Sequence, residues 1–486
     1  MARKSRSGKL SSLDKTLYKQ TNSYSKTTNK LLILLLSFSL LSCNSKDEVT
    51  LLFVGDILLE RNVQEEYTTR KTFPWENLKQ KFESADYVIG NLEGAVGNEE
   101  QQINKTHESP VFAIDSADIA MLHKAGFNSL IIENNHSLDL GIEGKTKTEK
   151  ILVTNNLGAI NFENSPQFIE IKNIILSVVA INLVPSRDSS KNELPSIEIR
   201  QKLRLAKKLS NLVVVYVHWG TELLTWPNSQ QRQAAKWLIE NGADLIIGCH
   251  PHVIQEPEII EGKPVYFSLG NHLFDQKYPI TKEGLIAEIK IKNGKVYCSG
   301  IKTKVQKNSF YPQLAENLNF NTEPFKYNKK LLTADEYTFK PVSIALSTKT
   351  IIQAYKSDKL AWSSHPMHLI SITSTQFETD KTVLFTLEKY YSTLDKETNL
   401  RPYVYSFDKS GLFALWRGSA LAWPMMDALL SPKDNKTLCV LHRGDSFIQL
   451  NYSNKSYRTA AYTWNGFGFS GLTDSISDYY CKDVFD

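Results

Sequence analysis

Six short segments between Leu51 and Gln276 end in side chains that can bind metals or transfer protons. They are Val54-Gly55-Asp56, Gly90-Asn91-Leu92-Glu93, Asn134-Asn135-His136, His218-Trp219-Gly220, Gly248-Cys249-His250-Pro251-His252 and Ser268-Leu269-Gly270-Asn271. Nearly all of them follow apolar runs, so we expect them at the ends of strands. In an alternating α/β chain the carboxyl ends of parallel strands are where ligands bind, and side chains far apart in sequence can meet there. The donors present are those of a metal-dependent hydrolytic site.

His250 and His252 are the most specific of these features. We expect Pro251 to hold the pair extended, so that two imidazoles at i and i+2 point to a common side, as metal ligation requires. An isolated His-x-His pair is often incidental, but seven of the ten histidines lie between positions 107 and 272. We therefore interpret His250 and His252 as metal ligands.

Asp56, Glu93 and His136 have simpler explanations when each is taken alone. A strand-end carboxylate is commonly a turn former or a helix cap, and two adjacent asparagines commonly form a turn. Their joint placement after three successive apolar runs favours a site instead. Asp139 follows His136 by three residues, which is close enough to orient an imidazole.

Short β-rich runs alternate with amphipathic helical patterns from Thr50 onward, which indicates an α/β layer fold. The predicted strands are 50–55, 86–90, 129–132, 174–181, 212–217, 245–248 and 265–269, and the predicted helices are 116–125, 142–155, 197–209 and 229–241. The run 213–217 is nearly all apolar, as suits a central strand covered on both faces, and it places His218 at its end. Asn293-Gly294 predicts a hairpin between 285–291 and 295–301.

The length of 486 residues favours two folded domains. We assign residues 43–306 to an α/β domain, the polar residues 307–340 to a linker, and residues 341–486 to a smaller β-rich or α+β domain of unknown role. The formal net charge of +5 comes from the basic first 42 residues. The remaining chain therefore gives no electrostatic reason to expect nucleic acid as a partner.

The amino-terminal residues carry an export pattern. A basic, polar stretch leads into the apolar residues 31–42, which are too few to span a bilayer, and Leu40-Leu41-Ser42-Cys43 resembles a bacterial lipobox. We expect a signal peptide over residues 1–42, cleavage before Cys43 and lipidation of its thiol, with a plain secretory signal or an uncleaved anchor as alternatives. This predicts a protein of the cell envelope, exported and anchored to a membrane.

Four cysteines follow Cys43, namely Cys249, Cys298, Cys439 and Cys481. None has CxxC spacing, which argues against a structural zinc site. An exported chain permits disulfides, so buried free thiols and one optional bridge both stay open.

Taken together, the six segments resemble the CapA family of poly-γ-glutamate capsule biosynthesis proteins, which belongs to the calcineurin-like metallophosphoesterase superfamily. The resemblance covers roughly residues 51–304, about half of the chain. The matching segments are Phe53 to Asp56, Ala85 to Gly94, Asn134-Asn135-His136 with Asp139 and Gly141, His218-Trp219-Gly220 with Glu222, Gly248 to Gln255, and Ser268 to Asn271 with Phe274-Asp275. The resemblance implies a metallophosphoesterase-like two-sheet α/β sandwich with metal ions at the strand ends.

The resemblance also implies roles for individual residues. The ligands of one or two divalent metal ions, among which manganese, iron and zinc are not distinguished, would be Asp56, Glu93, Asn135, His218, His250 and His252. Glu93 would bridge two ions. His136 would donate a proton to the leaving group, with Asp139 beside it. The residues that would support the ligands are Asn91, Glu222, Asn271 and His272.

Two positions depart from the superfamily pattern. Where the superfamily has Asp-x-His, this chain has Asp56-Ile57-Leu58, so one imidazole ligand is missing and the first metal site is expected to be weak or empty. His272 stands where we expect an aromatic residue after the Ser-Leu-Gly-Asn motif. It either lines the site or packs behind it.

These features predict an envelope-anchored protein with a metal-dependent, hydrolase-type site that acts in the synthesis, export or processing of a capsular or anionic polymer such as poly-γ-glutamate. The expected partners are that polymer, the membrane through the lipid anchor, and membrane-embedded polymer synthase subunits. The missing imidazole leaves open an alternative of another class, a non-catalytic polymer-tethering or assembly lipoprotein with a vestigial metal site.

Overall fold

The computed structural model of the chain describes residues 48–97, 110–306, 308–318, 320, 322–378, 381–392, 396–418, 425–443 and 457–485. Residues Glu48–Asp486 form one compact unit. The predicted signal peptide over residues 1–42 and the predicted lipidation site at Cys43 lie outside the described residues. Within the described ranges, no helix is both long and apolar enough to cross a membrane.

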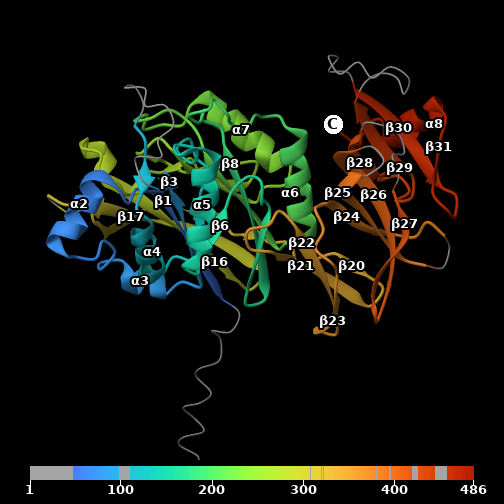
Figure 1. The fold of residues 1–486 in the computed structure, drawn as a ribbon, viewed down its shortest axis with the longest axis horizontal. Helices are drawn as coiled ribbons and strands as arrows, with labels where there is room; N and C mark the ends of the chain where they lie inside the picture. Colours follow the sequence, from blue (N-terminus) through green and yellow to red (C-terminus); the bar gives the residue numbers. More distant parts are fainter. Residues whose placement is uncertain are drawn as a thin grey trace, which may run out of the picture. The chain divides into compact units, whose positions relative to one another are not determined.

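The first of two large sheets has the strand order β18-β17-β16-β1-β2-β5-β6. Figure 1 labels four of these strands, β1, β6, β16 and β17. Its strands are β1 (Val49–Ile57), β2 (Tyr87–Leu92), β5 (Ser129–Ile131), β6 (Gly158–Ile160), β16 (Glu283–Lys292), β17 (Lys295–Val305) and β18 (Pro312–Leu318), with β15 (Asn271–Leu273) paired to β1 and β19 (Phe325–Lys326) paired to β17. Strands β1, β2, β5 and β6 run parallel, whereas β16 to β18 are antiparallel. The parallel strands bring their carboxyl ends to one edge.

The second sheet has the order β12-β13-β10-β9-β8-β7. Its strands are β7 (Gln167–Ile171), β8 (Ile174–Asn182), β9 (Leu212–His218), β10 (Leu245–Cys249), β12 (Glu258–Ile260) and β13 (Lys263–Tyr266). Strands β8, β9, β10 and β13 are parallel. Two short pairs complete this part, β3 (Ala95–Val96) with β4 (Ala113–Ile114) and β11 (Ile254–Gln255) with β14 (Ser268–Leu269).

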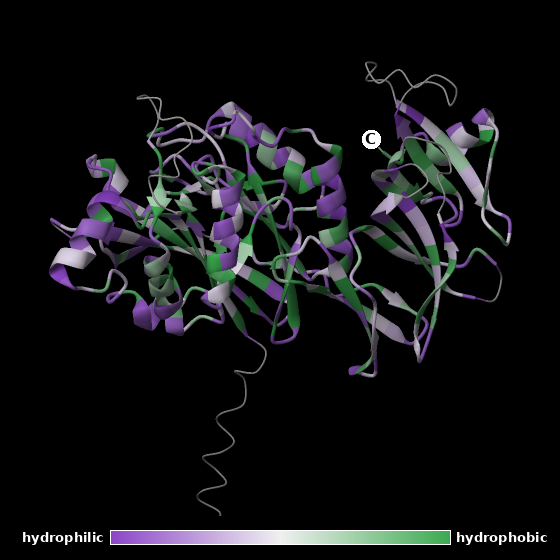
Figure 2. Cartoon of the chain, in the orientation of Figure 1, coloured by the Kyte–Doolittle hydropathy of each residue, from purple (hydrophilic) through white to green (hydrophobic). Residues whose placement is uncertain are grey.

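Alternating side chains along β1 explain why the two sheets stack. Leu51 and Phe53 pack in a core that also contains Tyr216 of the second sheet. Leu52 and Val54 belong to a second core on the other face. Successive residues of a strand point to opposite faces, so a strand that is apolar on both faces has to be covered on both sides. Figure 2 shows this apolar character along the strands.

Helices cover the outer faces of both sheets. Those of the first sheet are α2 (Arg61–Arg70), α3 (Lys79–Glu83), α4 (Ala120–Ala125) and α5 (Gly141–Thr154), and those of the second are α6 (Ile197–Leu209) and α7 (Ser229–Glu240). Two short 3₁₀ segments are η2 (Ser116–Ile119) and η3 (Pro279–Lys282). Sequence-encoded caps begin the two helices of the second sheet, because Ser196 caps α6 and Asn228 forms a capping box with Gln231 at α7.

The carboxyl-terminal part is built from antiparallel strands in three small sheets. They are β20 (Thr333–Ala334), β21 (Tyr337–Ser343), β22 (Thr350–Lys356) and β23 (Lys359–Ser363); β24 (Leu369–Thr375), β25 (Val383–Ser392), β26 (Glu397–Asp408) and β27 (Gly411–Arg417); and β28 (Met425–Leu430), β29 (Leu438–Arg443), β30 (Tyr457–Trp464) and β31 (Phe469–Gly471), followed by helix α8 (Asp474–Cys481). The predicted fold class, a two-sheet α/β sandwich followed by a β-rich part, is confirmed.

The range 307–340 differs from the predicted polar connector. It contributes β18 and β19 to the edge of the first sheet and contains β20 and the start of β21. Backbone hydrogen bonds to β17, which do not depend on apolar side chains, explain why a polar segment can extend a sheet. The exact domain boundaries stay a prediction.

Candidate metal centre

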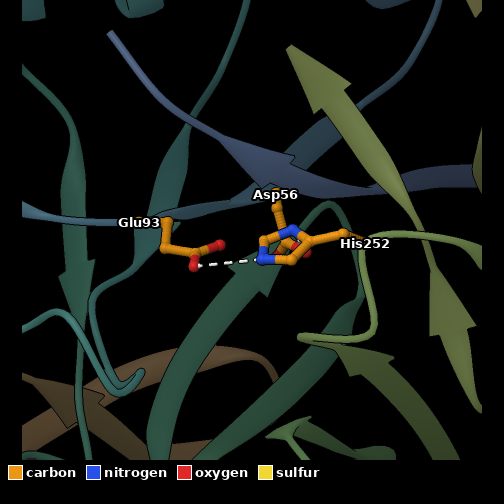
Figure 3. Close-up of side chains that lie close together, drawn as sticks. All are labelled: Asp56, Glu93 and His252. Atoms are coloured by element: carbon orange, nitrogen blue, oxygen red, sulfur yellow. Dashed lines mark ion pairs between the residues drawn. The ribbon is translucent and has the colours of Figure 1, made fainter. Parts of the chain in front are cut away.

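Asp56, Glu93 and His252 form a compact group of buried donors at the carboxyl ends of strands or just beyond them (Figure 3). Each offers one ligand atom, and these atoms all lie within 4.8 Å of one another. His252 Nδ1 lies 3.3 Å from Asp56 Oδ2, and His252 Nε2 lies 3.6 Å from Glu93 Oε1. Two carboxylates and an imidazole at this spacing are a suitable donor set for one divalent cation.

Parallel pairing aligns the ends of the strands that carry these donors. Asp56 of β1 is in register with Asn91 of β2 and with Asn271 of β15. Glu93 directly follows β2, and its amide donates a hydrogen bond to the carbonyl of Ile57 at 2.9 Å. The two carboxylates therefore come from neighbouring strands of one sheet.

Two glycines permit the close backbone approaches around the site. A Cβ at Gly55 would lie 1.8 Å from the carbonyl oxygen of Gly270, and a Cβ at Gly248 would lie 2.1 Å from that of Phe267. No side chain fits at such distances. The glycines in the two motifs are therefore explained by packing of strand ends.

The sequence predicts an extended segment His250-Pro251-His252, and this prediction is wrong. His250 has φ 98° and His252 has φ 59°, so both adopt the left-handed region, which L-residues rarely occupy. The chain turns sharply after β10, and the two ring centroids lie 6.1 Å apart. Strained backbone held in place by its surroundings is common at functional sites.

Glu93 is completely buried, and neither of its carboxylate oxygens has a hydrogen-bond partner among the described residues. Burial raises the pKa of Glu93 well above its usual value; the positive charge of His252 opposes this, and the carboxylates of Asp56, Glu222 and Asp139 add to it. A buried carboxylate without hydrogen bonds is costly unless a cation accompanies it.

Asp56 and His252 stabilise each other's charged forms. Burial alone would raise the pKa of Asp56, but the hydrogen bond and the charge of His252, together with Asn91, lower it to about 2. Burial alone would lower the pKa of His252, but Glu93 and Asp56 raise it to about 10. The charges of these groups are thus interdependent.

A second set of donors lies beside the first and consists of Asn135, His218 and His250. His218 Nε2 lies 2.8 Å from Asn135 Oδ1, and the rings of His218 and His250 are 4.8 Å apart. Burial lowers the pKa of His250 to about 3 and the pKa of His218 well below its usual value. The Nδ1 atoms of both rings have no hydrogen-bond partner among the described residues.

His136 and Asp139 form a dyad that faces the first set. His136 Nδ1 lies 2.8 Å from Asp139 Oδ2, and His136 Nε2 lies 3.8 Å from Glu93 Oε1. Asp139 Oδ2 also accepts a hydrogen bond from the amide of Phe112 at 2.8 Å, and the Phe112 ring stacks on the imidazole at 4.0 Å. The ring is held with Nε2 toward the carboxylates.

Leu58 occupies the position of the missing imidazole ligand and packs in a small apolar cluster with Phe112 and Phe274. Phe274 in turn lies 4.7 Å from the ring of His252. The structure fills this side of the first donor set with hydrocarbon rather than with a further ligand.

The four supporting residues behave differently. Asn91 Nδ2 donates to Asp56 at 2.8 Å, and Asn271 Oδ1 lies 2.9 Å from His252 Nδ1, so both orient the donors. Glu222 is an exposed side chain, and its negative charge raises the pKa of Glu93. His272 points the other way from Asn271, as alternation along β15 requires.

His272 packs in the outer core of the first sheet. Its Nε2 accepts a hydrogen bond from the Trp75 indole at 3.0 Å, and its ring stacks on Phe82 at 5.8 Å. Burial lowers its pKa to about 3. Of the two alternatives for His272, the structure shows packing.

Two groups near the dyad escaped the sequence analysis, Phe112 and Arg187. Phe112 follows no recognisable motif. Arg187 lies five residues beyond Asn182, a polar residue at the end of β8. A polar residue at the end of an apolar run is the signal that identified the other segments, although Asn182 itself binds the following loop rather than the donors.

The residues present fit divalent metal ions. Oxygen and imidazole donors suit manganese, iron and zinc alike, and the buried oxygens of Glu93 and the Nδ1 atoms of two imidazoles lack hydrogen-bond partners among the described residues. Asp56, Glu93 and His252 would hold one ion, and Asn135, His218 and His250 would add donors for a second next to it.

An α/β sandwich whose strand ends gather these carboxylates, amide and imidazoles defines a metallophosphoesterase-like protein. Residues 50–276 match the family described as bacterial capsule synthesis protein PGA_cap, and the chain thus carries a CapA-family domain. The resemblance seen in the sequence is confirmed.

Two curated relatives share this part of the chain. The "PGA biosynthesis protein CapA" of Bacillus subtilis (strain 168) is 28% identical over 267 residues, which are 51% of this chain and 69% of the relative. The "Capsule biosynthesis protein CapA" of Bacillus anthracis is 27% identical over 294 residues, 55% of this chain and 70% of the relative. A solved structure of Vps29 from Entamoeba histolytica aligns with 44% of this chain and 94% of its own at 14% identity, with a TM-score of only 0.23.

Proposed function

We propose that the protein acts at the cell envelope in the synthesis, export or processing of a capsular anionic polymer such as poly-γ-glutamate, and that its metal centre hydrolyses a phosphoester or amide bond of that polymer or of a precursor. The capsule role is inferred from the CapA relatives. The observation that carries the hydrolytic part is the buried Glu93 carboxylate without hydrogen-bond partners among the described residues, facing His252 and the His136–Asp139 dyad.

Metal ions bound by the two donor sets would supply Lewis acidity and stabilise developing negative charge. The chain's own contribution to proton transfer would come from His136. Asp139 fixes the Nδ1 side of its ring, so that Nε2 faces the donors, where a leaving group would depart. A positioned imidazole that delivers a proton is typically worth about 10² to 10⁴ in rate.

The proposed location and partners rest on the amino-terminal pattern. Export followed by lipidation at Cys43 would tether the domain to a membrane, near membrane-embedded synthase subunits and their polymer. A disulfide between Cys439 and Cys481 supports an oxidising compartment, because such bonds are rare in the cytosol.

The first test is the metal content of the purified protein, prepared without chelators and measured by elemental mass spectrometry. One or two equivalents of a transition metal, reduced in His250→Ala, support the centre. Hydrolysis of phosphodiester and γ-glutamyl amide substrates by the metal-loaded protein then tests the reaction. A metal content that stays below one equivalent after reconstitution with manganese, iron or zinc would contradict the proposed metal centre.

A second candidate function is polymer tethering or assembly without catalysis. The apolar cluster of Leu58, Phe112 and Phe274 in place of a ligand favours it. Substitution His136→Ala distinguishes the two in cells. Full capsule formation with normal metal content would favour tethering, whereas loss of capsule from a folded, metal-loaded variant would favour hydrolysis.

A further inference from the structure

Arg187 lies in the loop after β8 of the second sheet, whereas His136 and Asp139 lie in the turn that follows β5 of the first sheet. Its Nε lies 3.4 Å from Asp139 Oδ1, and its Nη2 donates to the carbonyl of Pro110 at 3.0 Å. The side chain is 16% exposed and that of Asp139 is 3% exposed. A guanidinium thus supplies the opposite charge to a carboxylate that is otherwise buried.

The two oxygens of Asp139 have separate tasks. Oδ2 receives the Phe112 amide and faces His136 Nδ1, each at 2.8 Å, while Oδ1 faces Arg187. Contacts on both oxygens fix the plane of the carboxylate, and that plane sets the direction of the hydrogen bond to the imidazole. Without the contact at Oδ1, only the two contacts of Oδ2 restrain the carboxylate.

The loop that carries Arg187 is itself held in place. Asn182, at the end of β8, and Asn192 bind each other through two hydrogen bonds, from Asn182 N to Asn192 Oδ1 at 2.9 Å and from Asn192 N to Asn182 O at 2.7 Å. Ser186 N donates to Ser190 O at 2.8 Å. The loop also starts at the site, because Leu183 N donates to the carbonyl of His218 at 2.9 Å.

We propose that Arg187 is a positioning residue of the reaction, which locks Asp139 and through it orients the His136 imidazole toward the donors. The effect of Arg187 on proton transfer rests on the proposed function. Its effect on the orientation of the His136 imidazole does not depend on that function. The guanidinium is suited to the task because it binds Asp139 and Pro110 with two different nitrogens, which a lysine cannot do with one.

The first experiment reads the imidazole directly. In zinc-loaded protein with ¹⁵N-labelled histidine, the Nδ1–H signal of His136 is identified by its loss in His136→Ala. In Arg187→Ala and Arg187→Gln we expect this signal to shift or to disappear through exchange with water, with partial retention in Arg187→Lys. Arg232→Ala is the matched control, because Arg232 pairs with Glu258 on the surface. Unchanged signals of the remaining histidines show that each variant is folded.

The second experiment reads proton transfer. Two diesters of the same phosphate are compared, one with a p-nitrophenol leaving group, which needs no proton, and one with an alkyl leaving group, which does. We expect Arg187→Ala to lower kcat for the alkyl ester by about 10-fold to 100-fold, with metal content and the p-nitrophenyl rate nearly unchanged.

The outcomes separate the two proposals. An unchanged His136 signal in Arg187→Ala and Arg187→Gln overturns the positioning role. A changed signal with equal loss on both esters overturns its link to proton transfer. A wild-type protein that hydrolyses neither ester, while the signal still responds to Arg187, overturns the proposed hydrolysis of phosphoesters and leaves the positioning of His136 in place.

Discussion

Glu93 is a completely buried carboxylate that faces two imidazoles. The carboxylate lies between His252 and His136, at 3.6 and 3.8 Å, without hydrogen bonds among the described residues. A structural carboxylate would normally receive donors from backbone or side chains. The absence of such donors within the described part of the chain is the reason to assign Glu93 to a cation.

Replacement of Glu93 by Gln tests that assignment with almost no change in volume. We expect the metal-dependent stabilisation to disappear, because the neutral amide lacks the charge that favours the ion. For the wild type, a free metal concentration 100-fold above Kd stabilises the fold by about 2.7 kcal/mol. The measurement is thermal unfolding with manganese and with a chelator.

In the presence of the chelator, Glu93→Gln is expected to melt within a few degrees of the wild type, because burial already favours the uncharged form of this carboxyl. Glu240→Gln, on the surface of α7, is the control and should keep the full response to metal. An equal metal response in Glu93→Gln would remove Glu93 from the ligand set.

Gly55 allows a prediction about sterics alone. In Gly55→Ala the new methyl group would overlap the carbonyl of Gly270, and the strands β1 and β15 would have to separate. We expect a loss of about 4 kcal/mol or more in the free energy of unfolding, or no folded protein. Denaturant unfolding measures it.

Gly262 is the matched control because it has φ 73° but nothing within 4 Å of a built Cβ. Gly262→Ala should cost only about 1 to 2 kcal/mol of backbone strain. Similar losses for the two variants would show that the close approach at Gly55 is not the reason for glycine there.

At the scale of elements, the sequence was most informative where strands are buried on both faces. The runs that form β1, β8, β9 and β10 are almost continuously apolar, so their positions and the polar residues at their ends could be predicted. The hairpin β16–β17 could be predicted as well, since Asn293 and Gly294 both adopt the positive φ that such turns require.

Other elements left no such pattern. Helix α2 buries only Val63, Glu66 and Tyr67, too few apolar positions to show a helical period. The pairing of β15 with β1, which brings Asn271 to the site, joins segments more than two hundred residues apart and depends on the closed fold. The contact of Arg187 with Asp139 left no pattern in the sequence either, because the loop after β8 and the turn after β5 meet only in the folded chain.

The disulfide Cys439–Cys481 is expected to stabilise the folded protein. The bridge joins β29 to the end of this helix across a separation of 42 residues, and Cys249 and Cys298 stay free and buried. Of the two alternatives left open by the sequence, one bridge is therefore present. The chain-entropy relation gives about 4 kcal/mol for a loop of this length.

Reduction with dithiothreitol should therefore lower the unfolding midpoint of the protein, measured by urea denaturation with tryptophan fluorescence. The double variant Cys439→Ser, Cys481→Ser is the control. It should unfold like the reduced wild type and show no further response to the reductant. A reduced wild type as stable as the oxidised protein would show that the bridge does not contribute.

At the scale of the whole molecule, helix α6 joins the α/β sandwich to the carboxyl-terminal strands. Its inner face packs on the second sheet through Leu203 and Ala206, while Leu205 and Leu209 belong to a core shared with β21, β22 and β24 to β26. Gln201 Nε2 also donates to the carbonyl of Met426 in β28 at 3.0 Å. These contacts predict that the described chain unfolds as one cooperative unit.

The ion pair between Arg204 of α6 and Asp427 of β28 provides the sharpest test of that coupling. Arg204 Nη2 lies 2.6 Å from Asp427 Oδ2, and the side chains are 25% and 3% exposed. Substitution Arg204→Ala leaves a buried carboxylate without its cation, so we expect a loss of about 3 kcal/mol. The surface pair of Arg232 and Glu258 is the control, and Arg232→Ala should cost less than about 1 kcal/mol.

Removal of both partners decides whether the penalty comes from the uncompensated charge or from the contact itself. In the double variant Arg204→Ala, Asp427→Ala no buried charge of this pair remains. The double variant should therefore be more stable than Arg204→Ala alone, and a double-mutant cycle should give a coupling free energy above about 0.5 kcal/mol.

Calorimetry should show a single transition for the wild type and two transitions for Arg204→Ala, because the carboxyl-terminal sheets lose a buried link to α6. Additive effects and an unchanged single transition would mean that the shared apolar core around Leu205 joins the two parts without help from the ion pair.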